Sequence, residues 1–458
     1  MENENLKVCF ARVCITPPLG INISGYFYPR IAKGVLDDLY ANAVSFVNSQ
    51  KTVVLISVDL LYITDDFANS YRRKISEKLN ISIDAVFLSA THTHTGPTLG
   101  IRETGDGMPI YDEYLGELLC NCAQMALDDA KAAKLSYSSG TVENIAFVRA
   151  YHMKDGSVKT NPGIGNPDIV RPVSEPHKGM YLLKAERDNT DDIYIVNFGV
   201  HPDTISGDYI SADWCGILRN TVENALGTVK CAFFTGFQGD LNHFDVSPIK
   251  GEWDIRHGYE FTKYMGMALA GGVLQICGKT KPFESKDIDF ATKKISIRTN
   301  KANDKLEDAK KVLELYRKYG ESFERREDTP NISVPEALRI ERLENGPESF
   351  EILLSAVKIG DVVFGGIPGE PFNDIGKRIR ERSKHKMTLL CCCTNGGSTY
   401  FPTSDAYDQG IYEAVSSNVK KGEDFVIADE MVKLINSLEN DSKVSKQKVS
   451  VKIKNQEE

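Results

Sequence analysis

The sequence predicts an α/β fold in which mixed β-sheets are flanked by helices and the active site lies at strand ends. Short apolar runs typical of strands alternate with amphipathic helical patterns along the chain. Several of these apolar runs lead into turns that are rich in glycine or carry histidine, and α/β proteins collect their active sites at the carboxyl ends of strands. The runs are residues 84–89, 193–198, 231–234, 362–364 and 387–393.

The first part of the chain is expected to form strands and then a helix. Residues 8–16 alternate enough to form a strand, which a Pro-Pro pair ends. Residues 43–47 and 52–58 flank an Asn-Ser-Gln turn, and this pattern predicts a hairpin. A helix over 65–79 follows, with two aspartates at its start.

Two later segments are also assigned from their patterns. Residues 112–133 place apolar side chains at helical spacing, which predicts a helix that packs on the core. Residues 161–176 contain four prolines and two glycines and show little periodicity. A loop of this length is expected to have a functional role. The stretch 97–112 is rich in glycine and proline and immediately follows the first histidine pair, so it is expected to wall a pocket.

The chain is expected to form one catalytic domain over residues 1–440, followed by a polar tail over 441–458. A segment at about 300–345 interrupts this domain and is dense in Lys, Glu and Arg. Its narrow apolar stripe predicts a solvated helical segment that projects from the main body of the domain. The alternative is a contact with a second copy of the chain, in a homo-oligomer.

Composition excludes several classes of partner. The 458 residues carry a formal net charge of -9, whereas nucleic-acid binding needs a basic face. No apolar run approaches the roughly 18 residues of a transmembrane helix, so no membrane span is expected. The polar N-terminus has no signal-peptide pattern, and three of the ten cysteines lie together in an apolar run. We therefore expect a cytoplasmic protein that acts on a small molecule.

Two of the eight histidines, His92 and His94, follow the 84–89 strand and precede a Gly-Pro pair. Residues two apart in an extended segment point to the same side. The two imidazoles could share a metal ion, or one could be a ligand and the other a proton carrier. The alternative is a pair of hydrogen-bonded polar residues at the edge of the core.

Further candidates for a metal site lie in the turns after other strands. His201 precedes a proline at a strand end, Glu370 follows a Pro-Gly turn, and Tyr400 follows a Gly-Gly turn. Zinc accepts nitrogen and oxygen ligands of these kinds, although tyrosine is unusual. Each residue also has an ordinary interpretation: a structural histidine, a solvated glutamate and a packed tyrosine.

Taken together and in order, these segments resemble the neutral/alkaline (non-lysosomal) ceramidase family over residues 8–430. The resemblance is to the N-terminal catalytic domain, which makes this chain a short ceramidase-like member. The family's metal motif carries serine where this chain has Thr95. The matching segments are residues 10–16, 91–97, 199–202 with 211–213, 368–370 and 395–407.

The resemblance implies a zinc centre with His94 beside the metal as a proton carrier and Arg149 in the active site. A tyrosine phenolate requires a strong local charge at neutral pH, which a divalent cation supplies. The ligands that the resemblance implies are His92, His201, Glu370 and Tyr400.

One position departs from the family pattern. Asn242 stands where the ceramidases carry a serine proposed to be catalytic, and asparagine cannot act as that nucleophile. The amide of Asn242, together with Arg149, could instead stabilise an oxyanion. Asp240 and Asp213 are candidates for orienting imidazoles, or alternatively for capping turns.

The sequence therefore predicts a zinc-dependent hydrolase that cleaves an amide bond with metal-bound water, on a substrate other than a classical ceramide. His94 would act as general acid or base. The second hypothesis is hydrolysis of a lactone, an ester or a carbohydrate-derived small molecule. The third is a catalytically silent member that binds a metal or ligand without turnover.

Overall fold

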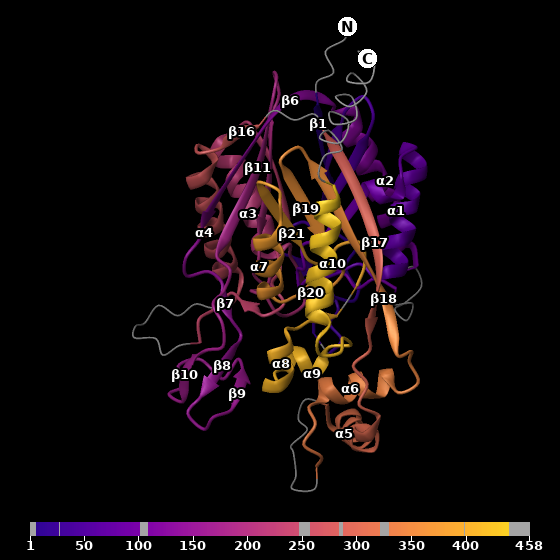
Figure 1. The fold of residues 1–458 in the computed structure, drawn as a ribbon, viewed down its shortest axis with the longest axis vertical. Coiled ribbons are helices and arrows are strands. Elements are labelled where there is room, and N and C mark those ends of the chain that lie inside the picture. Colours follow the sequence, from indigo (N-terminus) through magenta and orange to yellow (C-terminus); the bar gives the residue numbers. More distant parts are fainter. Residues whose placement is uncertain are drawn as a thin grey trace, which may run out of the picture.

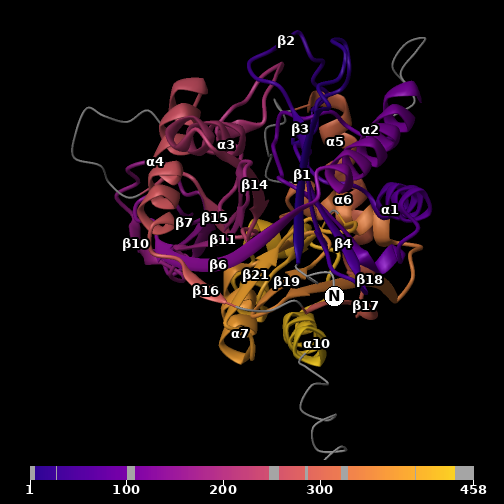
Figure 2. The same ribbon diagram turned by 90° about the horizontal axis from the view of Figure 1, so that it is seen from above.

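The computed structural model describes residues 6–26, 28–100, 109–246, 257–283, 287–320, 329–397 and 399–438. Two β-sheets form its centre, and helices cover their outer faces (Figure 1, Figure 2). The predicted α/β fold with mixed sheets is therefore confirmed.

The larger sheet is mostly antiparallel. Only β12 with β14 and β4 with β5 pair in parallel among its neighbours in the described residues. Its strands, in their order across the sheet, are β14 (Val229–Thr235), β12 (Asp192–Phe198), β11 (Gly179–Arg187), β6 (Lys131–Thr141), β1 (Lys7–Cys14), β3 (Tyr40–Val47), β4 (Thr52–Val58) and β5 (Val86–Ala90), with β16 (Lys281–Phe283) paired to β6.

The smaller sheet packs against the larger one through a buried apolar core. Phe87, Phe234 and Phe364 meet there, with ring centroids 6.4, 6.3 and 6.2 Å apart in edge-to-face contacts, a favoured aromatic geometry. The strands of this sheet, in order, are β17 (Ile288–Arg298), β18 (Ser349–Ile359), β19 (Val362–Gly366) and β21 (Met387–Cys391).

Helices pack on the outer faces of both sheets. Figure 2 shows one pair beside β1 and β4, and a second pair beside β14 and β11. A third pair lies on the smaller sheet. The pairs are α1 (Asp65–Leu79) with α2 (Pro109–Asp128), α3 (Asp213–Leu226) with α4 (Tyr259–Cys277), and α7 (Asn373–Arg382) with α10 (Glu423–Ser437).

The strand ends that the sequence singled out meet at one place, where the two sheets converge. The amide of Cys392 donates to the carbonyl of Thr235, and the amide of Ala90 donates to the carbonyl of Cys393. The Thr235 hydroxyl also donates to the carbonyl of Thr91, at 2.7 Å. The turns after β5, β14 and β21 are thus joined by hydrogen bonds.

Two predicted boundaries are wrong. The helix expected over 112–133 ends at Asp128, and residues from Lys131 onward form β6. The reason is tertiary: the Asp129 carboxylate accepts from the Phe10 amide at 3.1 Å and from Arg187 at 2.5 Å, which fixes the chain beside β1 and β11. The supposed loop at 161–176 contains β10 (Ile169–Pro172), in a small sheet with β8 (Ala150–Met153) and β9 (Val158–Thr160).

The charged segment at about 300–345 contains two helices, α5 (Leu306–Tyr319) and α6 (Val334–Leu343). Their apolar stripes pack on each other, so the stripe forms a small internal core. Figure 1 shows this pair at the end of the molecule opposite to β6 and β1, beyond β20 (Glu370–Pro371). The expected tail, 441–458, lies outside the described residues. Within the described part of the chain, no helix is both long and apolar enough to span a bilayer.

Candidate metal centre

His92 and His94 converge through a turn that follows β5. The strand ends at Ala90, and His92 has a left-handed φ of 74°, so the expected extended geometry of this pair is wrong. The amide of His92 donates to the carbonyl of Leu60 at 2.8 Å, and that of His94 donates to Pro202 at 3.2 Å. These contacts turn both rings toward one point.

The three histidines of the site are held in the same way, with Nδ1 of each ring facing a backbone carbonyl oxygen. Nδ1 of His92 lies 2.8 Å from the carbonyl oxygen of Leu61, and Nδ1 of His94 lies 3.1 Å from that of Gly25. His201 follows β12, and its Nδ1 lies 3.0 Å from the carbonyl oxygen of Gln238. A carbonyl only accepts, so each Nδ1 carries a proton, and in the neutral ring Nε2 then has a lone pair.

Those three Nε2 atoms point inward and form a candidate metal cluster. The ligand atoms of His92, His94 and His201 lie within 4.8 Å of one another. Oε2 of Glu370, from β20, lies 3.2 Å from Nε2 of His92 and 3.1 Å from Nε2 of His201. Nε2 of His201 and Oε2 of Glu370 are buried without a hydrogen-bond partner in the structure.

Such an arrangement requires positive charge. Burial opposes a charge on His92, but the adjacent Glu370 carboxylate outweighs it and raises the pKa of His92. Burial, reinforced by Arg149, lowers the pKa of His201 to about 3. Burial opposes ionisation of Glu370, yet the histidines hold its pKa well below its usual value. A carboxylate facing the neutral imidazole of His201 suits a divalent cation, and a cation would replace the positive charge that His92 otherwise carries, so the residues fit a metal ion.

Tyr400 and Arg149 lie beside this cluster. β22 (Tyr400–Phe401) pairs in parallel with β20, which places Tyr400 opposite Glu370. Nη1 of Arg149 lies 3.4 Å from the Tyr400 hydroxyl and 3.3 Å from Oε1 of Glu413. Burial, and then Glu370, raise the pKa of Tyr400, whereas Arg149 opposes that shift. The structure thus brings Tyr400 and Arg149 to the site.

Asn242 is occupied by contacts with two other side chains. Its Oδ1 accepts from Nε of Arg149 at 2.7 Å, and its Nδ2 donates to Oδ1 of Asn161 at 2.6 Å. It lies on β15 (Leu241–Asn242), which pairs with β7 (Phe147–Val148) just before the arginine. Asn242 therefore holds Arg149.

The two aspartates suggested as partners of imidazoles bind elsewhere. Asp240 accepts from the backbone and side-chain amides of Asn373, at the start of α7. Asp213 accepts from the backbone amide of Thr204 at 2.9 Å and from its hydroxyl at 2.6 Å. These hydrogen bonds match the turn-capping interpretation. Burial raises the pKa of both carboxyl groups to about 7.

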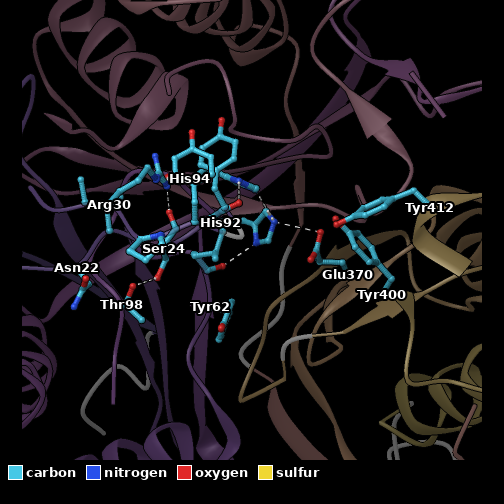
Figure 3. Close-up of a pocket in the computed structure, with 16 residues that line it drawn as sticks. Asn22, Ser24, Arg30, Tyr62, His92, His94, Thr98, Glu370, Tyr400 and Tyr412 are labelled. Atoms are coloured by element: carbon cyan, nitrogen blue, oxygen red, sulfur yellow. Dashed lines mark hydrogen bonds and ion pairs between the residues drawn. The ribbon is translucent and has the colours of Figure 1, made fainter. Parts of the chain in front are cut away.

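A cavity of 610 Å³ opens onto the candidate metal cluster (Figure 3). His92, His94, Glu370 and Tyr400 form part of its wall. Much of the remaining wall comes from the segment before β2 (Gly34–Val35), which the sequence had not suggested as functional. That segment contributes tyrosine rings and polar groups, from Asn22, Ser24, Tyr26, Tyr28 and Arg30. Tyr62, Thr98 and Tyr412 line the cavity from other parts of the chain.

The stretch 97–112 was expected to wall a pocket, and its Thr98 lines this cavity, whereas 101–108 lie outside the described residues. Sequence reasoning missed the part of the wall that 22–30 supply, because those residues match no motif. Its one signal was the density of glycine, tyrosine and proline in 20–30. Glu413 was also missed: it is fully buried against Arg149, and a single glutamate on a short helix, α9 (Tyr412–Ser416), carries no pattern.

No protein-family model matches the chain. Among solved structures, neutral ceramidase from Pseudomonas aeruginosa is similar, with a TM-score of 0.71 and 16% identity, over 95% of this chain and 75% of that one. A structure described as ceramidase complexed with C2 matches with the same TM-score, identity and coverage. The family resemblance seen in the sequence thus extends to the backbone, and the chain has a fold that resembles that of neutral ceramidase.

Proposed function

We propose that this protein is a zinc-dependent hydrolase that cleaves an amide bond in a small polar substrate. The observation that carries the proposal is the approach of two imidazole nitrogens to one carboxylate oxygen: Oε2 of Glu370 lies 3.2 Å from Nε2 of His92 and 3.1 Å from Nε2 of His201. Nε2 of His201 and Oε2 of Glu370 are buried without a hydrogen-bond partner. Two histidines and one glutamate form a common ligand set of catalytic zinc. Tyr400 is proposed as the fourth ligand, supported by its place opposite Glu370.

When bound, zinc would polarise a carbonyl oxygen and lower the pKa of a water molecule toward about 7. His94 is proposed as the general acid or base, because its Nε2 lies 3.3 Å from Nε2 of His92 and its ring lines the cavity. A proton taken up at Nε2 of His94 can be returned to the leaving nitrogen.

Arg149 is proposed to supply fixed positive charge behind Tyr400. Burial disfavours that charge, but Tyr400 and Glu413 raise the pKa of Arg149, so it stays protonated. The charge favours the ionised form of Tyr400 and helps stabilise negative charge that develops on a substrate oxygen. Asn242 takes no covalent role in this proposal and holds the guanidinium instead.

The cavity wall supports a polar substrate. Side-chain oxygens of Ser24 and Thr98 line it, with tyrosines, whereas its aliphatic members are few. The same wall favours a second candidate function, hydrolysis of a lactone, an ester or a carbohydrate-derived small molecule.

Purified protein should be assayed for bound metal and then for turnover on matched amides, esters and lactones with short polar and long acyl groups. We expect zinc near one equivalent and turnover of a small polar substrate that stops after chelation and returns with zinc. Bound zinc without turnover across the panel would contradict the hydrolase and favour a binding protein.

Replacing His92 with alanine should remove the bound metal, because the cluster loses one of its nitrogen ligands. His152→Ala is the matched control, since His152 lies on β8 in the small three-stranded sheet and outside the cavity wall. Unchanged zinc content in His92→Ala would exclude this ligand assignment.

A further inference from the structure

Asp203 and Tyr26 join two segments of the site that lie far apart in the chain. The Tyr26 hydroxyl donates to Oδ1 of Asp203 at 2.6 Å. The same oxygen lies 3.6 Å from Nδ1 of His94, which is a charge contact and too long for a hydrogen bond. Asp203 follows His201 by two residues, so it extends from the turn that supplies a proposed ligand.

The ring of Tyr26 packs on His94. Their centroids lie 5.9 Å apart at an interplanar angle of 70°, an edge-to-face contact. On its other sides, Tyr26 stacks on Tyr28 at 5.6 Å and lies 4.2 Å from the guanidinium carbon of Arg30. Tyr26 is thus enclosed by His94, Tyr28 and Arg30, and its hydroxyl is fixed by Asp203.

The backbone around this pair holds His94 as well. Gly25, next to Tyr26, supplies the carbonyl that faces Nδ1 of His94, and Pro202, next to Asp203, supplies the carbonyl that accepts from the His94 amide at 3.2 Å. A shift of either segment would therefore move an acceptor that orients His94. The Tyr26–Asp203 hydrogen bond links the side chains of the two segments at this point.

We infer that Asp203 is a positioning residue, which fixes Tyr26 against His94 and so holds the imidazole with Nδ1 protonated and Nε2 facing the cavity. This role deepens the proposed hydrolase function and rests on it for its effect on turnover. The orientation of His94 itself does not depend on turnover. Catalytic groups require such alignment, because misplacement by about 1 Å can cost on the order of a hundredfold in rate.

The test uses the full chain with Asp203→Ala, Tyr26→Phe and the double variant, and with Asp203→Asn as the conservative replacement. Asparagine keeps an oxygen that accepts from the Tyr26 hydroxyl, whereas alanine removes it. Asp208→Asn is the matched control, because Asp208 pairs with Lys33 at the surface of the same turn.

We expect Asp203→Ala and Tyr26→Phe each to lower kcat about tenfold, with KM changed less than about twofold. The kcat of the double variant should fall no further, because both single replacements remove the same hydrogen bond. Asp203→Asn should stay within about threefold of the parent. Additive losses in the double variant, or an Asp203→Asn as impaired as Asp203→Ala, would overturn the inference.

A second measurement separates this inference from the proposed function. Ring nitrogen chemical shifts of His94 in metal-free protein at pH 8.5, assigned with His94→Gln, report the tautomer directly. We expect one tautomer, protonated at Nδ1, in the parent and in Asp203→Asn, and a mixture in Asp203→Ala. An unchanged single tautomer in Asp203→Ala would overturn the inference even if the hydrolase is active, and a mixture would support it even if no substrate is turned over.

Discussion

Nε2 of His201 lies 3.1 Å from Oε2 of Glu370, and neither atom has a hydrogen-bond partner in the buried centre of the site. Because Nδ1 of His201 already faces two backbone carbonyls, the ring has no proton to offer the carboxylate. Two buried acceptors at this distance repel each other unless a cation lies between them. This pair is the most direct indication of a metal ion in the fold.

Replacing Glu370 with glutamine should abolish most of the stabilisation by zinc. A neutral amide keeps the size of the side chain but removes the ligand charge that holds the cation. With zinc at about a thousand times its dissociation constant, the parent should gain about 4 kcal/mol in the free energy of unfolding. The variant should gain less than about 1 kcal/mol, measured from Tm with and without zinc after chelation.

Glu348→Gln is the control for this experiment, because Glu348 is an exposed glutamate that pairs with Lys301. A zinc-induced rise in Tm of Glu370→Gln equal to that of the parent would show that the carboxylate is not a ligand.

Replacing Asn242 with serine should not create a better enzyme. The serine would remove the oxygen that accepts from Nε of Arg149 and leave that buried donor without a partner. We expect a loss of about 1–3 kcal/mol in the free energy of unfolding and a lower kcat. Asn69→Ser, at an exposed position of α1, should stay within about 0.5 kcal/mol of the parent. A gain in turnover by Asn242→Ser would mean that the position can act as a nucleophile.

Replacing Gly25 with alanine should displace His94. Gly25 has a φ of 115°, and an added Cβ would lie 2.8 Å from the His94 carbonyl oxygen and 2.9 Å from its Cβ. We expect turnover to fall at least tenfold while zinc content stays near that of the parent, since His94 is not a proposed ligand.

Gly156→Ala separates this clash from backbone strain. Gly156 also has a positive φ, 81°, but nothing lies within 4 Å of the Cβ position. Both variants should therefore carry the strain of about 1–2 kcal/mol, and only Gly25→Ala should lose activity. Equal activity in the two variants would show that His94 tolerates the displacement.

His177 should make the protein sensitive to mild acid. Burial, and then the nearby Arg380, lower the pKa of His177 to about 3, against about 6.5 when unfolded. Between pH 6.5 and 3 the unfolded chain binds a proton that the folded protein does not, so stability is lost as pH falls through that window.

His177→Gln should remove this loss, because glutamine does not titrate and can still contact the Tyr181 hydroxyl, which lies 3.0 Å from Nε2 of His177. We expect the free energy of unfolding, measured with urea, to fall between pH 7 and 4.5 by about 1–2 kcal/mol more in the parent than in the variant. This figure allows for partial solvent screening of His177. Parallel pH profiles for the two proteins would contradict this.

Much of the site could be predicted because its polar residues follow apolar strands. His92, His201 and Glu370 stand after buried apolar runs, and α/β proteins collect their active sites at the carboxyl ends of strands. The convergence of His92 and His94 was predicted for the wrong reason. It depends on the left-handed φ of His92, which is fixed by backbone contacts with the turn after β4.

The cavity wall could not be predicted, because long-range contacts place it. Tyr26 and Arg30 reach the site through backbone contacts between 22–24 and 96–98 and through the bond to Asp203. The end of α2 was missed for the same reason, since pairing with β1 and β11 overrides a local helical pattern beyond Asp128.

Every histidine of the cluster is oriented by a main-chain oxygen, from Leu61, Gly25, Gln238 and Leu241. A main-chain oxygen does not depend on the identity of its side chain, so these orienting contacts depend on the path of the chain. They tolerate side-chain replacement except at Gly25, where an added Cβ would lie 2.8 Å from the His94 carbonyl oxygen. A centre built in this way can persist through extensive sequence divergence, provided that the turns are retained. The likeness of fold at 16% identity is consistent with such tolerance.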